Sequence, residues 1–265
     1  MTVPEILLLV SASAVAGAIN SVAGGGTLLT FPALLAAGHA STIANATSTT
    51  ALWPGQVSSL FGYRKEIRHN VRAIVPLLVI GLAGGAVGAY LLTVTSPALF
   101  DRIVPFLILG ATALFMAQEP ISRWQKSRRP PETDGKPVSP ETPEKLHLTP
   151  GIVLFLLGIS VYGGYFGAGI GILTLAALGL CGLTHIHQMN GIKNIFTLGI
   201  NGIAIVLFIT QGLVRWDTAG LMVVGSLVGG YAGAGIARRI GQKNVRRLVI
   251  LIGIALSLSL LLKRF

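Results

Sequence analysis

The stretch LTHIHQMNGIKNIFTLGINGIAIVLFIT (residues 183–210) holds Lys193, the one charged residue that lies deep inside an apolar run of this chain rather than near a run end. In a helix, five polar side chains of this stretch share one face because their spacing is i, i+3, i+4, i+7 and i+11. They are Asn190, Lys193, Asn194, Thr197 and Asn201. The other faces are apolar, and a charge at the centre of a membrane helix costs about 2.5–3.5 kcal/mol on insertion scales. We therefore expect an anion or a water-filled cavity beside Lys193.

The composition predicts a polytopic membrane protein. Of 265 residues, 52% are hydrophobic and only 11% are charged, and the mean hydropathy is +0.74. The 34 glycines point to closely packed helices. The net charge of +11 comes from basic residues in short loops, which the positive-inside rule explains better than nucleic-acid binding does. The single cysteine, Cys181, excludes an intrachain disulfide.

The apolar runs define an all-α integral membrane protein. We expect runs at 4–22, 26–38, 41–62, 73–93 and 97–118, a Pro-rich, disordered or loosely held linker at 119–149, and runs at 151–166, 168–181, 183–210, 218–237 and 245–262. The first run lacks the basic start of a secretory signal, so we interpret it as a membrane segment. Runs 26–38 and 168–181 span only about 20 Å at about 1.5 Å per residue, less than the roughly 30 Å of the hydrocarbon core. Each follows a glycine-rich break, and we interpret both as half-helices or re-entrant pieces.

The two halves are similar in sequence. A shift of 145 residues places Asn45 on Asn190, and the same shift aligns Ser48, Thr49 and Gln56 with Lys193, Asn194 and Asn201. Loop charge is biased in opposite directions in the two halves, so we predict inverted repeats with loops 63–72, 119–149 and 238–247 in the cytoplasm and both termini outside. The predicted division is residues 1–118 as the N-terminal membrane repeat, 119–149 as a cytoplasmic linker and 150–265 as the C-terminal inverted repeat.

Inverted repeats with paired short segments are typical of secondary transporters. The glycine breaks would start half-helices whose free N–H groups attract an anion, although packing of small residues is the alternative interpretation. We expect the Lys193 side chain to face the anion site rather than to reach along the helix to the membrane surface. The stripe of Asn45, Ser48 and Thr49 fits either a part of that site or hydrogen bonds between helices. All nine acidic residues fall in loops or at run ends, which favours an anionic cargo over a cation.

No sequence motif indicates enzymatic chemistry or a cofactor. His185 and His187 lack a third ligand, so we expect them, like His39, to structure loops rather than to bind metal. There is no Walker A pattern, no Gly-x-Ser-x-Gly motif and no carboxylate pair within an apolar run. We expect no catalytic residue, no metal and no cofactor.

Two groups of motifs resemble those of the TauE/SafE family of sulfite and organosulfonate exporters. The first half carries AGGGTLLTFPALL (23–35), ANATS (44–48) and GYR (62–64), and the second carries YGGYFGAGIG (162–171), NGIKN (190–194) and Asn201. The resemblance covers nearly the whole chain apart from 119–149. It implies export of small oxyanions or sulfur-containing organic acids across the inner membrane of a bacterium.

We therefore expect a multi-pass secondary transporter that binds a small anion between its halves within the lipid bilayer, with no nucleic-acid partner and with the oligomeric state open. The alternatives are a passive anion channel and, from another class, a membrane-embedded enzyme or assembly factor with a metal near His185 and His187. The predicted substrate-binding residues are Gly24, Gly25, Gly26, Thr27, Asn45, Ser48, Thr49, Gly167, Gly169, Gly171, Asn190, Lys193, Asn194 and Asn201.

Overall fold

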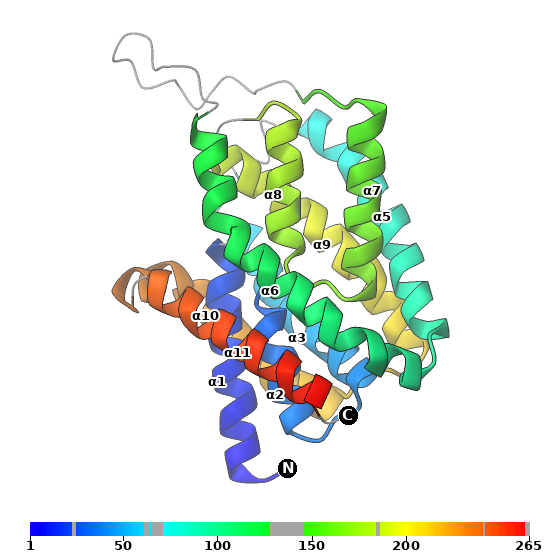
Figure 1. Cartoon of the computed structure of the whole chain (residues 1–265), viewed down its shortest axis with the longest axis vertical. Helices are drawn as coiled ribbons and strands as arrows, with labels where there is room; N and C mark the ends of the chain where they lie inside the picture. The colour runs from blue at the N-terminus through cyan, green and yellow to red at the C-terminus, as the bar shows by residue number, and fades with distance from the viewer. Residues whose placement is uncertain are drawn as a thin grey trace.

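The computed structural model describes residues 1–22, 25–60, 64, 71–127, 146–183, 186–240 and 242–262. Within these ranges all regular structure is helical, as the apolar runs predict, and no strand occurs (Figure 1). The helices are α1 (Val3–Val22), α2 (Thr27–Ala36), α3 (Ser41–Leu60), α5 (Val71–Val94), α6 (Pro97–Ser127), α7 (Pro150–Tyr165), α8 (Ile170–Leu180), α9 (Ile186–Thr210), α10 (Trp216–Ile240) and α11 (Gln242–Leu262).

Four stretches of the described helices are long and apolar enough to cross a membrane: Val3–Asn20, Ile74–Val94, Pro97–Ala117 and Gln188–Thr210. The helices α2 and α8 are as short as the sequence predicts, with 10 and 11 residues. At about 1.5 Å per residue, neither reaches across a hydrocarbon core of roughly 30 Å. Both lie inside the bundle, where most of their residues are buried. The molecule is therefore a helical membrane protein with two short inner helices.

Two basic or polar stretches differ most from the sequence-based expectation. The helix α6 continues to Ser127, past the predicted start of the linker at 119, and residues 128–145 of that linker lie outside the described part of the chain. The predicted loop 238–247 is mostly helical, because α10 extends to Ile240 and α11 begins at Gln242. Arginine and lysine are good helix formers, so a basic stretch is not necessarily a loop. Most of the predicted basic loop 63–72 also lies outside the described residues.

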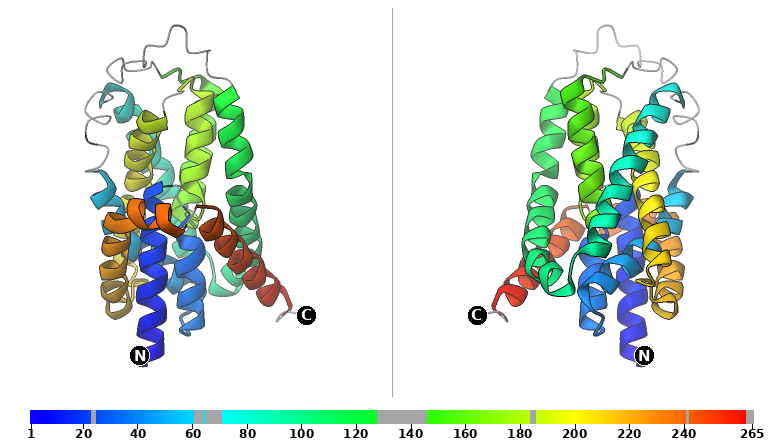
Figure 2. Two further views of the ribbon diagram at one scale, coloured as in Figure 1. Left: turned by 90° about the vertical axis from the view of Figure 1, so that its left-hand side faces the viewer. Right: turned by 90° about the vertical axis from the view of Figure 1, so that its right-hand side faces the viewer.

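The packing of the helices crosses between the two halves of the chain. The helix α5 packs on α7 and α9, and its counterpart by sequence, α10, packs on α1 and α3 in the same way. Figure 1 shows that α1 starts at the lower end of the molecule whereas α7 starts at the upper end, so these two counterparts run in opposite directions. In both views of Figure 2, α1 begins and α11 ends toward the same end of the molecule.

Glycines make the closest of these contacts possible. A Cβ atom added to Gly88 of α5 would overlap the carbonyl oxygen of Val161 in α7, and one added to Gly229 of α10 would overlap the carbonyl oxygen of Ala14 in α1. Only glycine allows two helix backbones to approach so closely, as in small-residue interfaces of other membrane proteins. The two halves are thus joined tightly along α5–α7 and α1–α10, while α3 and α9 meet between these pairs.

Candidate functional site

The polar stripe of α9 faces the protein interior. Asn190, Lys193, Asn194, Thr197 and Asn201 are each at most 8% exposed, and Lys193 is 2% exposed. Because α9 packs against α3, α5, α7 and α8, the buried stripe is enclosed by helices rather than by water. The sequence prediction that Lys193 faces inward rather than an interface agrees with this burial.

The stripe forms one wall of a cavity of about 30 Å³. Such a volume can hold one or two water molecules or another small polar group. The other walls come from three places: the turn between α1 and α2, the helix α3, and the break between α7 and α8. The lining residues are Asn20, Gly25, Thr27, Thr49, Leu52, Gln56, Gly167, Ile170, Gly171, Lys193, Asn194, Thr197 and Asn201.

Both glycine breaks place a helix start at this cavity. Gly25 has φ of 101° ahead of α2, and Gly167 and Gly169 have φ of 78° and 80° ahead of α8. These left-handed conformations favour glycine, and they let the chain reverse direction within the bundle. Thr27 and Gly171, in the first turns of α2 and α8, line the cavity. The first N–H groups of a helix carry a partial positive charge that favours an anion.

Two buried donors of the cavity wall lack an acceptor. Among the described residues, Lys193 Nζ and Asn194 Nδ2 are buried and have no hydrogen-bond partner. A buried polar group without a partner costs about 1–3 kcal/mol, and a charged group costs more. No carboxylate lines this cavity. The site therefore offers donors and positive charge and requires an acceptor.

Three of the predicted polar residues are absent from the cavity lining, and two of them, Asn45 and Ser48, tie helices together. Asn45 Nδ2 donates to the carbonyl oxygen of Tyr165 at 3.0 Å, which ties α3 to the end of α7. The Ser48 Oγ and Thr30 Oγ1 atoms are 2.6 Å apart and tie α3 to α2. Asn190 is buried one turn before Lys193, and its Oδ1 atom has no partner among the described residues.

The predicted set thus divides in two. The cavity brings together Gly25, Thr27, Thr49, Gly167, Gly171, Lys193, Asn194 and Asn201, but its lining does not include Gly26, Asn45, Ser48, Gly169 or Asn190. Gly26 and Gly169 instead cap the starts of α2 and α8. Gly24 and His185 lie outside the described residues, as does the side chain of His187.

Three polar lining residues, besides the aliphatic Leu52 and Ile170, were not among the predicted site residues. Asn20 Oδ1 accepts a hydrogen bond of 2.8 Å from the backbone N–H of Gly26 and so supports the first glycine break. Gln56 Oε1 accepts a hydrogen bond of 3.1 Å from Asn201 Nδ2, across the contact between α3 and α9. Thr197 belongs to the polar stripe, and the spacing of that stripe could have found it. Asn20 is a lone amide in an apolar run and has no comparable signal.

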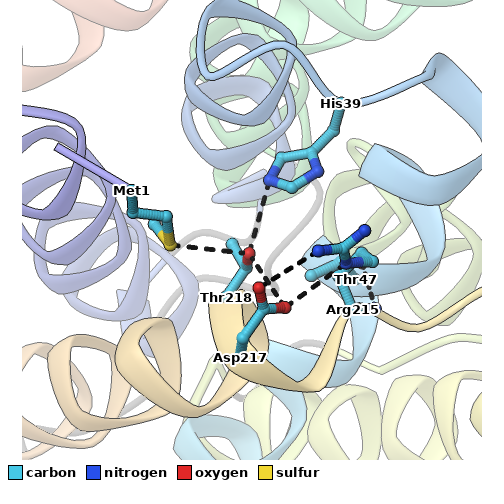
Figure 3. Close-up of polar contacts among 6 residues, drawn as sticks. All are labelled: Met1, His39, Thr47, Arg215, Asp217 and Thr218. Carbon is cyan, nitrogen blue, oxygen red and sulfur yellow. Dashed lines mark hydrogen bonds and ion pairs between the residues drawn. The ribbon is translucent and has the colours of Figure 1, made fainter.

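A second polar cluster lies where α10 begins (Figure 3). Arg215 and Asp217 form an exposed ion pair of 3.2 Å, which lowers the pKa of Asp217 to about 2. The backbone N–H of Arg215 donates to Thr47 Oγ1 at 3.1 Å, and Thr218 Oγ1 lies 3.3 Å from His39 Nε2. Burial, followed by the charge of Arg215, lowers the pKa of His39. This cluster joins α10 to α3 and to the segment between α2 and α3, and it lies apart from the cavity lining.

Within the described ranges, no three or more metal-ligating side chains lie together. In that part of the chain, His39 and Asp217 approach the same threonine, Thr218, but they lack a third ligand of the kind that binds zinc. Cys181 is a free, buried thiol.

Comparison with known proteins gives one consistent result. The sequence model of the family described as Sulfite exporter TauE/SafE matches residues 9–260. The chain is 28% identical to "Probable membrane transporter protein ORF9" of a Sinorhizobium species, over 94% of this chain and 90% of that protein. It is 29% identical to a "Probable membrane transporter protein" of Haemophilus influenzae, over 89% and 87%, and 27% identical to "Probable membrane transporter protein YfcA" of Escherichia coli K12, over 93% and 86%. No solved structure matches the chain at a significant level.

Proposed function

This chain belongs to the TauE/SafE family and is a multi-pass membrane transporter rather than an enzyme, and we propose that it is a secondary transporter that exports a small anion. Sulfite and organosulfonates are the candidate cargoes, because the family model is described as that of sulfite exporters. We place the chain in the inner membrane of a bacterium. The anion would bind in the cavity between α3, α9 and the two glycine breaks.

The observation that carries this proposal is the pair of buried donors without acceptors, Lys193 Nζ and Asn194 Nδ2. An oxyanion supplies what both groups need, since it brings a negative charge and several acceptor oxygens. The starts of α2 and α8 add backbone donors from two further sides. A cation would meet the ammonium group of Lys193 with no lining carboxylate to offset the repulsion.

The size of the cavity indicates how the cargo would pass. A volume of about 30 Å³ is too small for an organosulfonate as it stands, so the walls must separate before such a cargo enters. We propose that one half moves against the other around the site, in the manner of transporters with inverted repeats. The matching contacts of α5 with α7 and of α10 with α1, and the opposite directions of α1 and α7, support two inverted repeats (Figure 1). The proposed repeats are residues 1–118 and 150–265, joined by a cytoplasmic segment at 119–149.

A binding screen tests the choice of cargo. The purified protein in detergent is heated with sulfite, sulfate, thiosulfate, sulfoacetate or methanesulfonate, and a specific ligand raises the melting temperature in a saturable way. We expect Lys193→Gln to abolish that rise. The control is Arg102→Gln, which removes an exposed positive charge on α6 without touching the cavity and should keep the rise.

Flux measurements then separate a carrier from a channel. Proteoliposomes loaded with the stabilising anion should show saturable uptake and counter-flow of the labelled anion, because a carrier binds one cargo in each cycle. Equal uptake by the wild type and Lys193→Gln would contradict the proposed site. Uptake that never saturates and shows no counter-flow would indicate a passive channel instead.

A further inference from the structure

The amine of Lys193 has no acidic partner among the residues that line the cavity. The other lining residues are amides, hydroxyls, glycines and two aliphatic side chains, Leu52 and Ile170. The helices that pack against α9 carry no acid, because α3 and α8 contain no titratable residue at all and α7 contains only tyrosines. The helix α5 contains Tyr90 and, in its first turn, Arg72, whose side chain lies outside the described part of the chain. The lysine is thus the one group at this cavity, within the described part of the chain, that can exchange a proton near neutral pH.

The tyrosines on the helices around α9 do not contact the cavity. The Tyr162 hydroxyl donates to the carbonyl oxygen of Ala168 at 2.7 Å, and the Tyr165 hydroxyl donates to Thr95 Oγ1 at 3.4 Å. Tyr90 of α5 is 60% exposed on the outside of the bundle. None of the three lines the cavity, so none is placed to compensate the lysine.

The protonation of the lysine and the binding of an anion must then favour each other. An isolated buried charge is so unfavourable that the group gives up its proton instead, whereas an adjacent anion stabilises the charged form. Linkage makes this effect reciprocal: the anion promotes protonation by the same factor by which protonation promotes anion binding. In the first half of the chain, the position that aligns with Lys193 is Ser48, which cannot play this part and is already paired with Thr30.

We propose that Lys193 takes up one proton with each anion and releases it with that anion on the other side of the membrane. This inference rests on the proposed function. On entry, the lone pair of the neutral amine accepts a proton from water, and the resulting ammonium donates to an oxygen of the anion. On exit, the anion leaves and the proton returns to water, so that no other reactant is needed. A monoanion would cross without net charge movement, and a dianion would carry one negative charge instead of two.

Binding as a function of pH tests this directly. The probes are sulfate, thiosulfate, sulfoacetate and methanesulfonate, because none of them changes its own charge between pH 6 and 9. For the anion that binds best, we expect the Kd of the wild type to rise up to tenfold per pH unit toward pH 9. Lys193→Arg keeps a charge at all these pH values, so its Kd should not change with pH, while Arg102→Gln should behave like the wild type.

Transport gives the second readout. With a pH-sensitive dye inside proteoliposomes and the voltage set by potassium and valinomycin, the wild type should move one proton per anion. Anion transport without proton movement, together with a wild-type Kd that is constant from pH 6 to 9, would overturn this inference but leave the proposed function standing. If no anion of the panel binds or is transported, the proposed function itself fails. Should Lys193→Arg not fold, the slope of the wild-type Kd with pH still decides the matter.

Discussion

The contact between α1 and α10 predicts that Gly229→Ala destabilises the protein. A Cβ atom at Gly229 would overlap the carbonyl oxygen of Ala14 and lie 2.6 Å from its carbonyl carbon. Carbon atoms in favourable contact are about 3.5–4.0 Å apart, so α1 and α10 must separate by about 1 Å. Overpacking costs about 1–3 kcal/mol, and a backbone obstacle that cannot rotate away places this change at the upper end. Alanine regains up to about 1 kcal/mol of helix preference over glycine.

The net loss is then about 2 kcal/mol, which lowers the Tm of a chain of this size by roughly 4–8 °C. The assay is thermal unfolding in detergent, followed with a thiol-reactive dye that becomes fluorescent when buried Cys181 is exposed. The matched control is Gly220→Ala in the same helix, where an added Cβ atom has no neighbour within 4 Å and the Tm should stay equal or rise. If the Tm of Gly229→Ala stayed within a degree of this control, the reasoning would be refuted.

Three other changes probe the site and the outer cluster. A double-mutant cycle with Gln56→Ala and Asn201→Ala should give a coupling of about 0.5–1.5 kcal/mol in unfolding free energy, because the two side chains share one hydrogen bond; additive effects would show that the bond contributes nothing. Asn20→Ala removes the acceptor of the buried Gly26 N–H, so the protein should lose about 1–3 kcal/mol and bind the anion more weakly, as thermal unfolding and ligand titration would show. Because the folded state lowers the pKa of His39, the unfolded state binds more protons, and the Tm should fall as the pH drops from about 6.5 through the lower folded value. The variant His39→Gln should lack that part of the pH dependence, and an identical profile would contradict the assignment.

The sequence predicted the wall of the cavity that carries the charge. A lysine in an apolar run is rare, and its helical spacing from Asn194 and Asn201 placed all three on one buried face. The glycine breaks were equally visible, because each precedes an apolar run that is too short to cross a membrane. The helices α2 and α8 begin at these breaks, and both breaks reach the cavity.

The sequence could not predict which polar residues line the cavity and which form hydrogen bonds between helices. Asn45 and Ser48 have the same spacing in the first half as Asn190 and Lys193 in the second, but of these four only Lys193 lines the cavity. Asn45 and Ser48 instead bond to Tyr165 and Thr30. Which amide faces a cavity depends on the rotation of a helix against its neighbours, and that rotation is set by long-range contacts. The ends of helices in basic stretches were also hard to predict. The charge of residues 238–247 suggested a loop, but most of this stretch is helical because arginine and lysine favour helices.

The hydrogen bond between Gln56 and Asn201 joins two positions that a shift of 145 residues makes equivalent. If the chain arose by fusion of two copies of one gene, the ancestor was a homodimer in which this residue touched its own twin across a two-fold axis. Only a side chain that both donates and accepts can bond to an identical neighbour, and a carboxamide does so in either direction. A lysine on the two-fold axis of that homodimer would repel the same lysine of the other copy. After fusion the position of Lys193 no longer had to match its sequence counterpart, Ser48, so the two residues could differ. Joining the copies therefore allowed one half alone to acquire a cationic group, which a strictly symmetric ancestor had to carry twice or not at all.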